Sequence, residues 1–119
     1  MQPGLSKRIQ GGVSDGIIVD DHPKHRGIDY DKYTDPDRLR IDTDPRDRGS
    51  KWLVAVTLEE RYEIIRQTLE NHEVKLGDSR RTFRSIQQPN SIGVSNGKLV
   101  NTVEVRFDGR RAHGYPCGP

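Results

Sequence analysis

One stretch, residues 51–72, constrains the fold more than any other part of the sequence. It begins with a short apolar run, Lys51-Trp-Leu-Val-Ala-Val56, which holds the sole tryptophan and is typical of a buried strand. The next four residues, Thr57 to Glu60, form a capping box, in which the two end side chains satisfy free amide groups at a helix start. The sequence therefore predicts a strand that leads directly into a helix.

The predicted helix is amphipathic. Its apolar side chains recur at four-three-four spacing and form one stripe, Leu58, Tyr62, Ile65 and Leu69. The opposite side of the helix carries charged residues, Glu59, Glu63, Arg66 and Glu70. A helix with this pattern is expected to pack its apolar stripe on a sheet.

A β-hairpin is predicted around Asn96-Gly97, because both residues tolerate the positive φ that a two-residue turn requires. The strand after this turn extends to Phe107 and alternates apolar and polar side chains, so one face of its sheet is expected to meet solvent. Residues 79–88 are compatible with a helix or a strand, and their β propensity favours the strand.

The fold class predicted from these signals is α+β, with one amphipathic helix packed on a small antiparallel sheet in residues 51–110. Only 30% of the residues are hydrophobic and 32% are charged, too few apolar residues to bury a large core along the whole chain. Residues 1–50 are rich in Asp, Arg, Pro and Gly, which predicts a long irregular arm with one short strand at 16–20. Residues 111–119 are predicted to be an irregular tail.

Aspartates in the arm favour turns, and Asp35-Pro36-Asp37 is predicted to be one of them. Apolar and aromatic residues are spaced through the same segment like anchors for a partner: Ile28, Tyr30, Tyr33, Leu39 and Ile41. Such a segment either orders on a partner or is disordered. The first functional expectation is therefore a non-enzymatic structural or interaction protein. It would be a minor component of a virus or phage particle or another multiprotein complex, with protein partners or self-association.

The alternative expectation is a nucleic-acid-binding protein. Residues 75–111 hold 8 basic residues against 3 acidic ones, an excess that favours phosphate. The candidate contacts are Arg80, Arg81, Arg84, Lys98, Arg106, Arg110 and Arg111. Ordinary surface arginines on a solvated sheet face would give the same pattern.

No motif indicates catalysis or a cofactor, so no enzyme activity, cofactor or metal site is predicted. Two pairs, His22 with His25 and His113 with Cys117, have side chains that suit zinc, but nothing in the sequence brings the pairs together. A single cysteine excludes an intrachain disulfide framework. No apolar run approaches the roughly 20 residues that cross a bilayer. We therefore expect a protein that is not secreted and has no membrane contact, located in the cytoplasm or within a virus particle.

Overall fold

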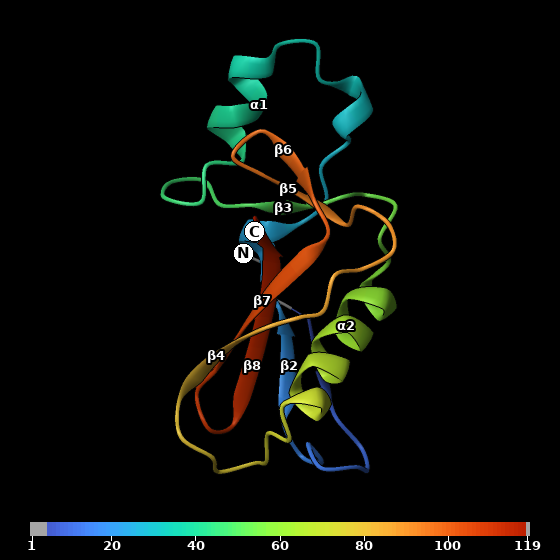
Figure 1. Ribbon diagram of the computed structural model, residues 1–119, viewed down its shortest axis with the longest axis vertical. Coiled ribbons are helices and arrows are strands. Elements are labelled where there is room, and N and C mark those ends of the chain that lie inside the picture. Colours follow the sequence, from blue (N-terminus) through green and yellow to red (C-terminus); the bar gives the residue numbers. More distant parts are fainter. Residues whose placement is uncertain (1–4, 119) are drawn as a thin grey trace.

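The computed structural model describes residues 5–118 and shows a mixed α/β fold with two α-helices and two sheets of mostly antiparallel strands (Figure 1). The five-stranded sheet has the order β1 (Leu5–Arg8), β2 (Ile18–Asp21), β8 (Arg111–Cys117), β7 (Thr102–Phe107) and β4 (Arg81–Arg84). The three-stranded sheet has the order β3 (Lys51–Trp52), β5 (Gly93–Ser95) and β6 (Lys98–Val100). The helices are α1 (Pro36–Asp42) and α2 (Leu58–Asn71), and two 3₁₀ turns are η1 (Pro23–His25) and η2 (Tyr30–Lys32).

Helix α2 begins at the capping box. The Thr57 hydroxyl accepts a hydrogen bond from the Glu60 amide at 3.1 Å, and the Glu60 carboxylate accepts one from the Thr57 amide at 3.4 Å. The apolar stripe of α2 faces the five-stranded sheet, and Tyr62, Ile65 and Leu69 are buried in the core between them. No helix within residues 5–118 is long and apolar enough to cross a membrane.

The long N-terminal arm is not confirmed. Strand β2 lies between β1 and β8, and Ile17 and Val19 are 0% and 2% exposed in the core beneath α2. Asp21 joins this segment to the helix, because Arg61 Nε and Nη2 donate to its two carboxylate oxygens at 3.1 and 3.2 Å. The segment has few apolar residues, but α2 covers them, so they contribute to a core formed with distant parts of the chain.

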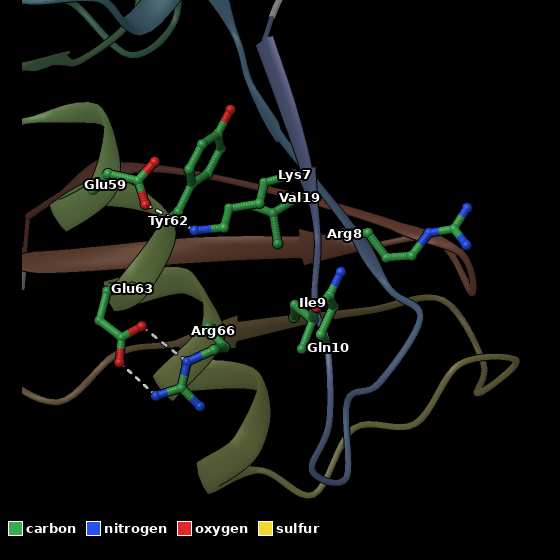
Figure 2. Close-up of a pocket in the computed structure, with 9 residues that line it drawn as sticks. All are labelled: Lys7, Arg8, Ile9, Gln10, Val19, Glu59, Tyr62, Glu63 and Arg66. Carbon is green, nitrogen blue, oxygen red and sulfur yellow. Dashed lines mark hydrogen bonds and ion pairs between the residues drawn. The ribbon is translucent and has the colours of Figure 1, made fainter.

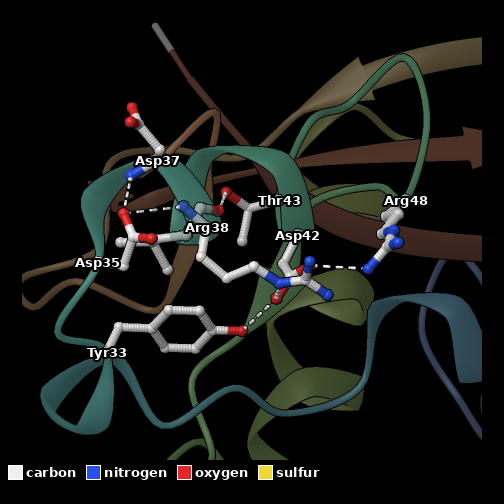
Figure 3. Close-up of polar contacts among 8 residues, drawn as sticks. Tyr33, Asp35, Asp37, Arg38, Asp42, Thr43 and Arg48 are labelled. Carbon is white, nitrogen blue, oxygen red and sulfur yellow. Dashed lines mark hydrogen bonds and ion pairs between the residues drawn. The ribbon is translucent and has the colours of Figure 1, made fainter.

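The predicted turn at Asp35 is the start of helix α1. The Asp35 carboxylate caps the helix by accepting from the Asp37 amide at 2.9 Å, and Pro36 occupies the first turn (Figure 3). At the other end of α1, Asp42 accepts from Tyr33 at 2.7 Å and from Arg48 at 2.8 Å. An aspartate that precedes proline can cap a helix or begin a turn, and Asp35 caps a helix.

The prediction of an irregular tail at residues 111–119 is wrong, because residues 111–117 form β8, the central strand of the five-stranded sheet. Gly114 is needed for packing, since a Cβ there would lie 2.8 Å from Ile65 on α2. Pro116 lies beyond the last residue that pairs with β2, His113, so its missing N–H leaves no unmade bond with that strand. Gly and Pro therefore permit close packing here and do not end the strand.

The strand predicted to run from the hairpin to Phe107 is divided at Asn101. Its first part, β6, pairs with β5 across the predicted Asn96-Gly97 turn, and its second part, β7, belongs to the five-stranded sheet. Strand β5 approaches β8 closely, because Gly93 packs directly against the ring of Pro116. The ambiguous segment is a strand at β4, as its β propensity favoured.

Candidate nucleic-acid interface

The five-stranded sheet has one face covered by α2 and one open face. Side chains that point toward α2 are buried in the core, Val19, Phe83, Val103, Val105, Phe107 and Ala112. Side chains alternate along each strand, and residues directly opposite each other on neighbouring strands share a face. The intervening residues therefore point away from α2, and on the central strand Arg111 is exposed and His113 and Tyr115 are half-buried.

The strand register places these outward side chains in rows. One row crosses β4, β7 and β8 through Arg84, Glu104 and Tyr115. The next row crosses the same strands and β2 through Thr82, Arg106, His113 and Asp20. We call this surface the open face, made by Arg8, Asp20, Thr82, Arg84, Glu104, Arg106, Arg111, His113 and Tyr115.

Charge on the open face is predominantly positive. Of its two carboxylates, Asp20 is paired with Arg111 at 2.7 Å, and Glu104 accepts a hydrogen bond from the Tyr115 hydroxyl. Within residues 5–118, no carboxylate forms an ion pair with the other three arginines, Arg8, Arg84 and Arg106. Arg84 donates to the Gly118 carbonyl at 2.9 Å, and the Arg106 guanidinium lies 5.5 Å from the centre of the Tyr115 ring, but no described carboxylate neutralises any of the three guanidinium groups.

A pocket of ≈ 640 Å³ lies at one end of the open face. Turn η1 follows β2 directly and brings His22, Lys24 and His25 to the side of β8, where they line the pocket with His113 and Tyr115. The ring centroids of His22 lie 6.1 Å from His25 and 5.9 Å from His113. We call this cavity the histidine pocket, lined by His22, Lys24, His25, Ser50, Arg84, Glu104, Arg106, His113, Tyr115 and Cys117.

The histidine pocket contains all four candidate zinc ligands considered from the sequence. Parallel pairing of β2 with β8 brings the two distant pairs together, which no local pattern could indicate. Their present geometry is not that of a metal centre, because no three His, Cys, Asp or Glu residues within 5–118 are arranged to hold an ion. The charge and hydrogen bonding of the pocket therefore determine which ligand it suits.

Burial and neighbouring cations control ionisation in the pocket. Burial lowers the pKa of His25 to about 4, against the opposing effect of its hydrogen bond with the Ser50 carbonyl at 2.7 Å. Burial also lowers the pKa of His113, and nearby His22 and Arg106 lower it further. Burial and the bond to Glu104 raise the pKa of Tyr115 to about 12. At neutral pH, His25 and His113 are thus neutral imidazoles in a cationic environment.

The predicted nucleic-acid residues do not all share one surface. Arg84, Arg106 and Arg111 lie on the open face. Arg81 points to the opposite side of β4, with its guanidinium 5.0 Å from the centre of the Phe83 ring. Lys98 belongs to the other sheet. The remaining two residues, Arg80 and Arg110, lie just outside β4 and β8. The prediction missed Arg8, which strand pairing places on the same face at the opposite edge of the sheet, and Lys24, which η1 carries into the histidine pocket.

The predicted partner-binding residues pack mainly within the chain. Ile28 and Leu39 are 8% and 6% exposed and form a small core with Val94 of β5. Tyr30 and Tyr33 are partly buried against the same core. Ile41 is the exception at 40% exposed. These anchors do rest on a neighbouring surface, but that surface belongs to the same chain.

A second groove, of ≈ 430 Å³, lies between β1 and α2 (Figure 2). Four of its five charged side chains form pairs, Lys7 with Glu59 at 2.8 Å and Arg66 with Glu63, and the fifth is Arg8. Figure 2 shows that Arg8 is directed away from α2, and the register of β1 with β2 places it on the open face. Since this groove has little free charge, the open face is the better candidate for an anionic ligand.

No protein family model, curated protein or solved structure matches this chain. Its function is therefore inferred from the geometry of the open face.

Proposed function

We propose that the open face binds the phosphate backbone of a single-stranded nucleic acid. The observation that carries the proposal is the group of three arginines, Arg8, Arg84 and Arg106, which lie on one sheet face without carboxylate partners among the described residues. Guanidinium groups suit phosphate because they donate two parallel hydrogen bonds to its oxygens. Lys24 extends the positive surface into the histidine pocket.

A single strand fits this surface better than a duplex. The major groove of DNA accepts a helix or a two-stranded ribbon, whereas a broad sheet face is a surface on which proteins lay single strands. Tyr115, the only Phe, Tyr or Trp of the open face, is stacked on His25 with ring centroids 4.9 Å apart and lies 5.5 Å from the Arg106 guanidinium. Phosphate contacts are therefore expected to provide most of the affinity, and base stacking little of it.

We expect Arg84→Ala and Arg106→Ala each to weaken binding of a fluorescent 2′-deoxy 12-mer by about 10- to 150-fold. Loss of a charge-assisted hydrogen bond costs about 1.5–3 kcal/mol, which corresponds to that range. Fluorescence anisotropy at several salt concentrations measures the affinity, and each lost phosphate contact should reduce the salt slope by about 0.7.

Arg81→Ala is the matched control, because Arg81 lies on the same strand but on the face toward α2. It should bind like the wild-type protein. If Arg81→Ala weakens binding while Arg84→Ala and Arg106→Ala do not, the open face is not the interface.

A non-enzymatic role in a larger assembly, through protein partners or self-association, is a second proposal. It is favoured by exposed apolar side chains at the end of the molecule that holds α1: Ile41 is 40% exposed, and Leu99 is 44% exposed on β6, an edge strand. Exposed apolar edge strands pair readily with other chains. Light scattering at high protein concentration should then show a species larger than the monomer, which Leu99→Lys would remove. A monomer at every concentration would leave self-association without support.

A further inference from the structure

Two imidazoles in the histidine pocket are free of hydrogen bonds within the described residues, those of His22 and His113. Their ring centroids lie 5.9 Å apart, with His22 exposed and His113 half-buried on the central strand. The third histidine, His25, is held by the Ser50 carbonyl and by its stack on Tyr115. Free imidazoles are the side chains best suited to move protons near neutral pH.

The surroundings of this histidine pair suit a phosphodiester. Lys24, Arg84 and Arg106 line the same pocket. Its one carboxylate, Glu104, is already bonded to Tyr115. Ser50 also lines the pocket, and its buried hydroxyl has no hydrogen-bond partner within residues 5–118. Cationic side chains beside two free imidazoles suit a phosphate that undergoes proton-coupled chemistry.

We propose that His22 and His113 cleave RNA at this pocket as a metal-independent acid–base pair, an activity that rests on the proposed single-strand binding. His113 removes the proton from a ribose 2′-hydroxyl, and the 2′-oxygen forms a bond with the adjacent phosphorus. The bond from phosphorus to the 5′-oxygen breaks, and protonated His22 donates a proton to that oxygen. The products are a 2′,3′-cyclic phosphate and a 5′-hydroxyl, and both histidines regain their starting protonation by exchange with water.

The pocket assigns distinct tasks to these groups. His113 is the base because its lowered pKa leaves the imidazole neutral at neutral pH. His22 is the acid because its exposed ring can recover a proton from solvent. Arg106 and Lys24 stabilise the additional negative charge on the phosphate oxygens as the new bond forms. His25 and Tyr115 act as positioning residues that form one wall of the pocket.

The test is cleavage of a 5′-labelled RNA 12-mer in EDTA, with the product ends identified by mass spectrometry. We expect a 2′,3′-cyclic phosphate, and we expect His22→Ala and His113→Ala each to reduce the rate by about 10²- to 10⁴-fold. The matched control is His72→Ala, because His72 is the fourth histidine, packs on Phe83 and does not line the pocket, and its ring contacts a pocket residue at the Arg84 backbone carbonyl, 3.3 Å away. It should cut RNA at the wild-type rate.

Binding of the 2′-deoxy 12-mer, which cannot be cut by this reaction, separates the two proposals. If the wild-type protein binds this strand and leaves RNA intact, the cleavage proposal is overturned and single-strand binding stands. If it binds neither strand, both proposals fail. Equal cleavage by the wild type and by both histidine variants would also overturn the assignment. His113→Asn, checked by circular dichroism and deoxy-strand binding, replaces His113→Ala if the alanine variant does not fold.

Discussion

Asp21→Ala is expected to destabilise the protein by about 3–5 kcal/mol, because it leaves one member of a buried ion pair without its partner. The side chains of Asp21 and Arg61 are 5% and 13% exposed, and two hydrogen bonds of 3.1 and 3.2 Å join them. The pair connects β2 to α2, and its loss would leave the Arg61 guanidinium desolvated beneath the helix. Urea denaturation followed by circular dichroism measures the loss as a lower midpoint with an unchanged slope.

Asp20→Ala is the natural control for this prediction. Asp20 is the neighbouring residue on the same strand but lies on the open face, where its partner Arg111 is substantially exposed. Exposed ion pairs contribute about 0–1 kcal/mol, so this variant should melt close to the wild type. Similar losses from Asp20→Ala and Asp21→Ala would mean that β2 does not present one face to α2.

Ile17→Ala is expected to cost about 2–5 kcal/mol, the usual range for removing a large aliphatic side chain from a packed core. Ile17 is 0% exposed and belongs to the core that includes α2 and the five-stranded sheet. The same denaturation experiment measures the change. This residue lies in the segment that composition alone would assign to an irregular arm, so the result tests whether that segment is part of the folded core.

Ile18→Ala provides the comparison, because the next residue points to the opposite face and is half-buried. Its replacement should cost about 1 kcal/mol or less. A loss from Ile17→Ala no larger than that from Ile18→Ala would show that residues 17–21 are not packed under α2.

The features that could be predicted from sequence depend on residues close together in the chain. The capping box joins Thr57 to Glu60, and the hairpin turn needs only Asn96 and Gly97 with the strands beside them. The β propensity of residues 79–88 likewise favoured the strand that became β4. Short-range hydrogen bonds and backbone preferences are sufficient for such elements.

The features that could not be predicted depend on contacts between distant residues. The bond from Arg61 to Asp21 spans 40 positions, and that from Arg111 to Asp20 spans 91. Gly114 and Pro116 are strand breakers by composition, yet one permits contact with α2 and the other lies past the end of β2. The residues of β2 and β8 become buried only when the five-stranded sheet forms, so their own sequence does not indicate a place in the core.

The candidate site shows the same division. An excess of arginine in residues 75–111 is visible in the sequence, but the register decides that Arg84 and Arg106 share the open face and Arg81 does not. His22 and His113 meet only because β2 and β8 are parallel neighbours. A chain with the same composition and another strand order would have the same charge and no histidine pocket.

Mapping of amide chemical shifts during titration with the 2′-deoxy 12-mer tests the central claim most directly. If the open face binds single strands, the shifts should concentrate on β4, β7, β8 and η1, around Arg84, Arg106 and Tyr115. Shifts confined to α2, to the groove between β1 and α2, or to the α1 end would contradict this account, as would a spectrum that does not change.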